Sequence, residues 1–150
     1  MLIYLGADHR GFELKEFLKK FLKKQSYKVI DVGNEKYDEN DDYPDFARLV
    51  ARAVSQDSLN RRGVVICGSG VGVDMVANKF DGVRSALANT PEQAKLSRKD
   101  DNANVLALAA EFTDENKAKE ILIAWLKESF SGEEKYKRRI EKISEIENNN

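Results

Sequence analysis

The sequence contains very little cysteine, histidine or proline: its 150 residues include 1 Cys, 1 His and 2 Pro. A single cysteine excludes an intrachain disulfide and is typical of a reducing compartment, so we expect a cytoplasmic protein. The one His and the one Cys lie far apart in the sequence, which argues against a zinc cluster. Any metal would therefore have to bind through carboxylates alone, and we expect no cofactor.

Long hydrophobic runs and an excess of one charge are also missing. No apolar run is long enough to span a bilayer, and the first residues lack the basic segment of a signal peptide. The 25 Lys and Arg balance 26 Asp and Glu, and the net charge is -1. Because a general nucleic-acid binder carries a basic excess, we expect neither nucleic acid nor a membrane as a partner. The 41% of hydrophobic residues suffice for the core of one domain over residues 1–150.

Apolar patterning alternates between strand-like and helix-like segments along the chain. Short apolar runs predict strands at residues 2–5, 27–32, 63–67, 83–88 and 104–108. Helical spacing predicts helices over 12–24, from 44 to about 54, over about 73–79, from 91, from 114 to about 126, and over 133–147. This alternation predicts one α/β domain with a doubly wound, parallel, five-stranded sheet. In such sheets, ligands bind beyond the carboxyl ends of the strands.

The last expected helix is highly charged. Its few apolar residues have helical spacing: Tyr136, Ile140, Ile143 and Ile146. Such a stripe packs on a neighbour more often than it faces water. We therefore expect a C-terminal helix that docks on its own domain or on another subunit.

The most informative segment follows the third expected strand: Cys67-Gly68-Ser69-Gly70-Val71-Gly72. Glycines at every second position let the backbone approach a ligand closely, and the N–H groups there can hold an anion. The alternative is a tight strand-to-helix turn without a ligand. A dinucleotide site is less well supported, because the spacing is Gly-x-Gly-x-Gly and the next strand ends in Asn89 without an acid.

Two strand ends carry reactive side chains. Cys67 faces the glycine segment, where a thiol can act as a nucleophile or a proton acceptor, or can be a buried structural cysteine. Asp8 and His9 follow the first strand and can open a sugar ring or hold a phosphate; alternatively, they are an N-cap aspartate and a surface histidine. The acidic run at 38–42 is expected to be a solvated loop. The basic cluster at 135–139 is expected to be a solvated face from which one or two side chains reach a phosphate.

Taken in order, these motifs strongly resemble the type B ribose-5-phosphate isomerases, a family that also includes the galactose-6-phosphate isomerase subunits. The resemblance covers essentially the whole chain. The matching segments are Gly6-Ala7-Asp8-His9-Arg10-Gly11-Phe12, Asp42-Tyr43-Pro44-Asp45, Cys67-Gly68-Ser69-Gly70-Val71-Gly72, Ala77-Asn78-Lys79, Leu96-Ser97-Arg98, Asn102-Ala103-Asn104-Val105-Leu106 and Arg139-Ile140.

The resemblance implies a Rossmann-like fold and a homodimer or tetramer with active sites at the dimer interface. It also implies a metal-free interconversion of an aldose and a ketose phosphate through a cis-enediol, with ribose 5-phosphate as the family's usual substrate. The implied roles are a proton carrier between C1 and C2 (Cys67), oxyanion stabilisation by a hydroxyl and loop amides (Ser69, Gly68, Gly70, Val71, Gly72), assistance at the ring oxygen (Asp8), a sugar contact (Tyr43) and phosphate binding (His9).

This chain departs from the family pattern at several positions. Asp100 replaces a His that the family contributes across the interface for ring opening, and Asp101-Asn102 replaces Asn-Asp. Glu111 replaces a phosphate-binding Arg, and a carboxylate there repels a dianion.

With these changes, Asp100 or a water is expected to open the ring, and Asp101 to contact the substrate. The first phosphate Arg of the C-terminal helix is Lys135 here, while Arg139 remains. The phosphate would then be held by His9, Lys135 and Arg139. Two alternatives stay open: a Cys-bearing subunit that pairs with an unlike paralogous chain in a galactose-6-phosphate-type isomerase, and a non-catalytic phosphosugar-binding protein.

Overall fold

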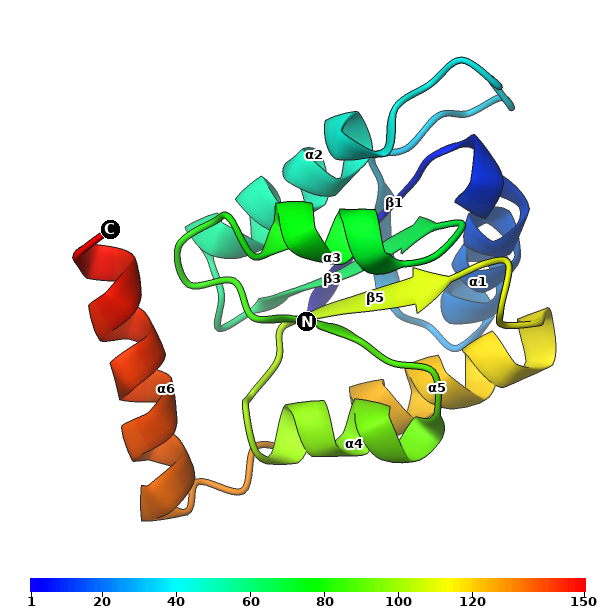
Figure 1. Ribbon diagram of the computed structural model, residues 1–150. Coiled ribbons are helices and arrows are strands. Elements are labelled where there is room, and N and C mark those ends of the chain that lie inside the picture. The colour runs from blue at the N-terminus through cyan, green and yellow to red at the C-terminus, as the bar shows by residue number, and fades with distance from the viewer.

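Five strands form one sheet between two layers of helices in the computed structural model, which describes residues 1–150 (Figure 1). The strands are β1 (Leu2–Ala7), β2 (Lys28–Asp31), β3 (Arg61–Cys67), β4 (Ser85–Leu87) and β5 (Val105–Ala109). The helices are α1 (Phe12–Lys24), α2 (Tyr43–Gln56), α3 (Val71–Ala77), α4 (Pro91–Lys99), α5 (Glu115–Lys127) and α6 (Glu134–Asn148), with a short 3-10 helix, η1, over His9–Gly11. None of the helices is long and apolar enough to cross a membrane.

All neighbouring strands are parallel, and their order is β2-β1-β3-β5-β4. The chain moves from β1 to β2 on one side and then returns to β3 on the other side, so the winding direction changes between β1 and β3. Ligands bind at such a switch point in open α/β sheets. The predicted doubly wound parallel sheet is confirmed.

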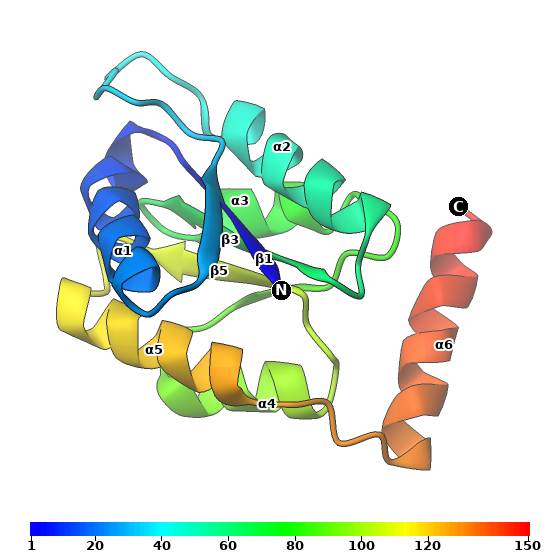
Figure 2. The same cartoon turned by 180° about the vertical axis from the view of Figure 1, so that it is seen from behind.

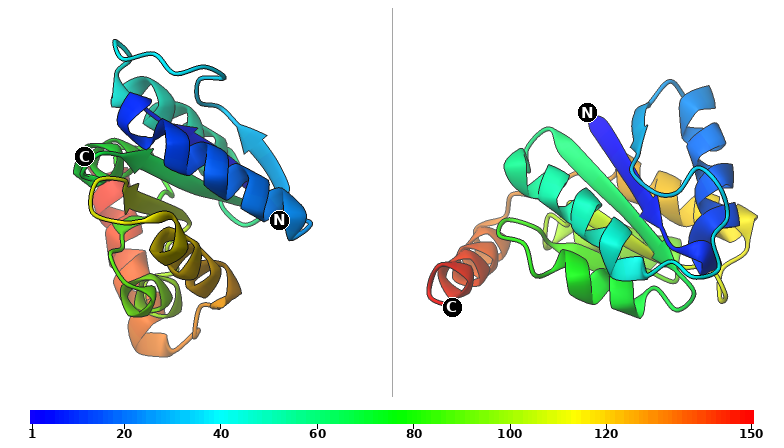
Figure 3. Two further views of the ribbon diagram at one scale, coloured as in Figure 1. Left: turned by 90° about the vertical axis from the view of Figure 1, so that its right-hand side faces the viewer. Right: turned by 90° about the horizontal axis from the view of Figure 1, so that it is seen from above.

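Two separate cores pack on the two faces of the sheet. One core joins the sheet to α1, α4 and α5, and the other joins it to α2 and α3. Figures 2 and 3 show these layers from behind, from the side and from above. Along β3, Val64 and Ile66 enter the first core, whereas Val65 and Cys67 enter the second. The thiol of Cys67 therefore faces the layer of α2 and α3.

Two element boundaries differ from the sequence-based prediction for identifiable reasons. α3 begins at Val71 because Gly70, with a φ of 74°, already ends the turn after β3. Val71 and Gly72 therefore lie in the first turn of the helix rather than in the loop. β4 begins at Ser85 because the backbone N–H of Arg84 donates to the side chain of Asn104 instead of to a neighbouring strand.

The C-terminal helix α6 stands away from the rest of the chain in Figures 1 and 3. None of its residues is buried, and Ile143 and Ile146 are 40% and 62% exposed. Glu147 accepts a hydrogen bond from the backbone N–H of Gly82 at 3.2 Å. Docking on its own domain is therefore slight, and Ile143 and Ile146 stay partly exposed beside Val83 and Ala103.

Candidate active site

The glycine segment after β3 wraps around the Cys67 thiol. Cys67 is 5% exposed, and the backbone N–H of Gly70 donates to its Sγ at 3.2 Å. The left-handed conformation of Gly70 is required for this turn, and a Cβ at this position would lie 2.5 Å from Leu87. Ser69 is exposed, and its Oγ accepts the Val71 N–H at 3.3 Å. Thiol, hydroxyl and backbone donors thus share one turn.

Tyr43, the first residue of α2, covers the start of α3. A Cβ placed on Gly72 would lie 2.6 Å from Cζ of the Tyr43 ring, so glycine allows the ring to approach the backbone. The ring is 38% exposed. The structure therefore brings Tyr43 to the glycine segment, where an aromatic surface can contact a sugar.

Asp8 lies beside the end of β3 because the preceding residue of β1, Ala7, pairs with Ile66, which precedes Cys67. It caps η1, since its Oδ1 accepts the Gly11 N–H at 3.1 Å. Burial raises the pKa of the Asp8 carboxyl, because only 4% of this residue is exposed and desolvation disfavours the charged form. The N-cap role and a place at the switch point therefore coexist in one residue.

His9 is held by a carboxylate from the acidic loop. Oδ1 of Asp41 lies 2.8 Å from the backbone nitrogen of His9 and 2.8 Å from its Nδ1. The hydrogen bond to Asp41 raises the pKa of the imidazole. The Asp41 side chain is only 7% exposed, so the expectation of a solvated loop at 38–42 is wrong at this position. Local sequence patterns do not predict this contact, because His9 and Asp41 are 32 positions apart and meet only in the folded chain.

The buried Lys15 of α1 forms hydrogen bonds that hold the acidic loop in position. The Lys15 side chain is fully buried, and its Nζ donates to Oδ2 of Asp31 at 2.5 Å and to the carbonyl of Asn34 at 3.1 Å. Nδ2 of Asn34 in turn donates to Oδ2 of Asp41 at 3.0 Å. A continuous chain of contacts therefore runs from α1 through the loop to His9.

Arg10 and Glu111 form an ion pair beside the glycine segment. Nε of Arg10 donates to Oε1 of Glu111 at 2.6 Å, and Nη2 contacts the same oxygen. The pair raises the pKa of the guanidinium. The backbone N–H of Glu111 donates to the carbonyl of Gly68, which ties the loop after β5 to the glycine segment. Sequence reasoning assigned no role to Arg10.

The other four predicted site residues do not lie beside Cys67. Asp100 caps the C-terminus of α4, and the carbonyl of Asp101 accepts a hydrogen bond from Arg84, which precedes β4. Lys135 and Arg139 flank the Tyr136 ring on α6. In Figure 1, α6 stands on the side away from the arrowhead of β5. These four residues therefore lie away from the carboxyl ends of β1 and β3, where Asp8 and Cys67 lie.

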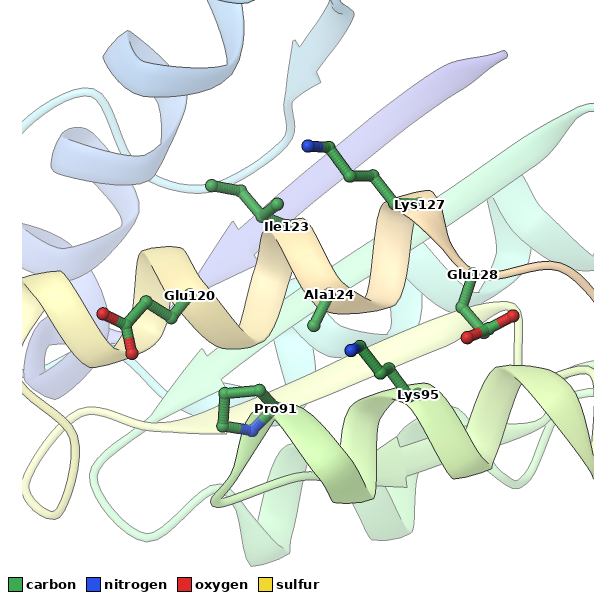
Figure 4. A pocket seen from close by; sticks show the side chains of 7 residues that line it. All are labelled: Pro91, Lys95, Glu120, Ile123, Ala124, Lys127 and Glu128. Atoms are coloured by element: carbon green, nitrogen blue, oxygen red, sulfur yellow. The ribbon is translucent and has the colours of Figure 1, made fainter.

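A separate groove runs between α4 and α5 (Figure 4). Its lining consists of Pro91, Lys95, Glu120, Ile123, Ala124, Lys127 and Glu128. These helices cover the face of the sheet opposite to the layer that Cys67 faces. The groove offers no thiol, hydroxyl or imidazole, so it is not the candidate active site.

The model of the Ribose/Galactose Isomerase family matches residues 3–143 of the chain. A protein named probable ribose-5-phosphate isomerase B from Mycoplasma genitalium is 43% identical over 145 residues, which is 97% of this chain and 95% of that protein. The D-erythrulose-4-phosphate isomerase of Pectobacterium atrosepticum is 38% identical over 130 residues, covering 87% and 85% of the two chains.

Solved structures agree with this match. The ribose-5-phosphate isomerase B of Mycoplasma genitalium with bound ribulose 5-phosphate superposes with a TM-score of 0.96 at 42% identity, covering 99% of this chain and 97% of that one. The enzyme from Clostridium thermocellum gives a TM-score of 0.94, also at 42% identity, and covers 99% of both chains. The chain therefore belongs to the ribose/galactose isomerase family.

Proposed function

We propose that this protein interconverts ribose 5-phosphate and ribulose 5-phosphate, with Cys67 as the base. Family membership and relatives named ribose-5-phosphate isomerase B make the chain a sugar-phosphate isomerase. The observation that carries the proposed mechanism is the position of the Cys67 sulfur, at a sheet switch point and within a turn of backbone donors. A lone free thiol in this role suits a reducing compartment, so we place the reaction in the cytoplasm.

The proposed reaction begins with ring opening. Asp8 is assigned the proton transfer to the ring oxygen, because its carboxyl lies at the switch point and burial raises its pKa, which favours the form that can donate. The Cys67 thiolate then takes the proton from C2 of the open aldose. The C–H electrons form the C1=C2 double bond, and negative charge develops on O1.

Stabilisation of this charge is assigned to the backbone N–H groups of Gly68 to Gly72 and to the Ser69 hydroxyl. The enediol forms as O1 gains a proton. Loss of the O2 proton and return of the proton from Cys67 to C1 then give the ketose. Tyr43 contacts the sugar, and His9 contacts the phosphate.

We further propose that two copies of the chain complete each site. Asp100, Asp101, Lys135 and Arg139 of one copy would face the Cys67 half-site of the other, with Asp100 or a water assisting ring opening. Two features support this arrangement. Asp101 and α6 lie away from the carboxyl ends of the strands, where Cys67 lies, and Ile143 and Ile146 of α6 are 40% and 62% exposed in the single chain. A closed dimer with twofold symmetry would then contain two equivalent sites.

Mixing two inactive variants tests this arrangement. Cys67→Ala damages one half-site, and the double variant Lys135→Ala/Arg139→Ala damages the other. After denaturation and refolding of an equal mixture, half of the dimers are hybrids and each hybrid has one intact site. About a quarter of the wild-type activity should therefore return. If a site is built from a single copy, the mixture stays inactive.

The activity itself is tested with the purified chain and a panel of aldose phosphates. We expect isomerisation of ribose 5-phosphate by the chain alone, whereas the four-carbon substrate named for the Pectobacterium relative tests whether a shorter sugar is preferred. If the pure chain is inert but binds phosphosugars, the proposed homomeric enzyme is wrong. Native mass spectrometry for a co-purifying unlike chain then separates a heteromer from a binding protein.

A further inference from the structure

The Arg10 guanidinium lies directly on the glycine segment. A Cβ placed on Gly68 would lie 2.4 Å from both Cζ and Nε of Arg10, so a glycine is required for this contact. Arg10 follows His9, and Gly68 follows Cys67. The cation therefore lies against the backbone of the residue that follows the predicted base.

Only part of the guanidinium is occupied. An arginine side chain has five N–H donors. Glu111 takes the Nε donor and one from Nη2, and no other protein group accepts from this side chain. Two donors on Nη1 and one on Nη2 remain. One donor of Nη1 and the remaining donor of Nη2 are parallel and form the outer edge of the guanidinium, and such a pair suits bidentate binding of a phosphate.

The pair with Glu111 fixes where this free edge points. Both side chains are about half exposed, at 49% and 46%, so the pair lies at the surface of the site. Exposed ion pairs add little to stability. The carboxylate holds one edge of the guanidinium at the loop after β5 and leaves the other edge open to solvent.

The carboxylate also changes the charge of the site. It offsets the charge of Arg10 and repels an approaching dianion. Arg10 therefore raises the affinity for phosphate, whereas the charge of Glu111 lowers it. Glu111 would orient Arg10 and, at the same time, weaken its attraction for phosphate.

We propose that Arg10 binds the phosphate of the sugar-phosphate substrate and that Glu111 is the positioning residue that orients Arg10 and limits its affinity. This inference rests on the proposed function, because it assigns the phosphate end of the same substrate. The chemical group recognised is a phosphate monoester dianion.

The test is calorimetric titration with inorganic phosphate, which requires no turnover, together with steady-state kinetics on ribose 5-phosphate. For Arg10→Ala, we expect the phosphate Kd and the KM to rise about tenfold or more, with a much smaller change in kcat, because charge-assisted hydrogen bonds are lost in the ground state. Arg10→Lys keeps the charge but not the fork, so it should restore only part of the affinity. Lys24→Ala makes the same charge change at the far end of α1 and should change neither constant.

Glu111→Gln should lower the phosphate Kd, because it removes a negative charge and keeps an oxygen that can accept from Arg10. In the Arg10→Ala background, the same change should bring a smaller gain. The proposal is overturned if Arg10→Ala leaves the phosphate Kd within about twofold of wild type, or if Glu111→Gln weakens binding. If the chain proves inactive on ribose 5-phosphate, the phosphate titration still decides the role of Arg10, so failure of the two proposals can be told apart.

Discussion

His9 and Asp41 are joined twice through one oxygen atom. Oδ1 of Asp41 lies 2.8 Å from the backbone nitrogen and 2.8 Å from Nδ1 of His9. The pairing directs Nδ1 toward the protein, leaving Nε2 as the ring nitrogen available for a ligand. It also stabilises the imidazolium, which is the form that binds an anion.

The pKa of His9 should fall when Asp41 is replaced by Asn. Asp41→Asn keeps the size of the side chain but removes the charge that stabilises the imidazolium. His9 is the only histidine, so its imidazole resonances in a proton–nitrogen NMR titration are unambiguous. Asp38→Asn changes an exposed acid of the same loop and serves as the control. An unchanged His9 titration in Asp41→Asn would contradict the structure.

Stability should depend on pH through the same pair. Because the pKa of His9 is raised in the folded state, protonation contributes stability that is fully present below the ordinary histidine pKa of about 6.5. This contribution is lost as the pH rises through the folded-state pKa. The free energies of unfolding of wild type and Asp41→Asn, measured with urea, should therefore differ more in mildly acidic buffer than in alkaline buffer. If the difference in the free energy of unfolding grew with rising pH, the His9–Asp41 pair would not be the cause of the pH dependence.

Lys15→Met should destabilise the fold by about 2 kcal/mol, because it removes the buried donor to Asp31 and to the carbonyl of Asn34, while Lys19 still pairs with Asp31. Burial alone would raise the pKa of Asp31, but hydrogen bonds from Lys15 and Lys19 outweigh it and hold the pKa below its usual value. The stability from this network is therefore present above the ordinary Asp pKa and is lost as the pH falls through the lowered one. Chemical unfolding measures the loss, with the exposed Lys20→Met as the control.

Gly72→Ala should push the Tyr43 ring away from α3, raising the KM for the sugar phosphate and costing about 1 kcal/mol of stability. The matched test is a double-mutant cycle. In the Tyr43→Ala background the clash is absent, and Gly72→Ala should be neutral or stabilising, because alanine is the better helix former. An equal cost in both backgrounds would exclude the contact as the cause.

The parts of the fold with strong local patterns were predictable from the sequence. β3 is a β-branched run buried on both faces, and the glycines after it mark the turn that holds Cys67. The start of α3 was misplaced by two residues, because the sequence does not show that Gly70 alone supplies the left-handed conformation.

The side-chain pairs of the candidate site could not be predicted from the sequence. Asp41 and His9, and likewise Arg10 and Glu111, meet only because distant segments converge at one edge of the sheet. The acidic run at 38–42 does not show in its sequence that one of its members, Asp41, is buried. The separation of Asp100, Asp101, Lys135 and Arg139 from Cys67 also depends on the direction of α4 and the position of α6, neither of which local patterns determine.

Cys67→Ser tests the central claim most directly, through the isomerisation rate of ribose 5-phosphate by the purified protein. The serine oxygen can still accept the Gly70 N–H, so the turn is kept while the thiol is lost. A positioned general base contributes about 10²–10⁴-fold to the rate. We expect kcat to fall by a factor in this range while phosphate binding, measured by calorimetry, is unchanged. A folded Cys67→Ser variant that isomerises the substrate at the wild-type rate would contradict the assignment of Cys67 as the base.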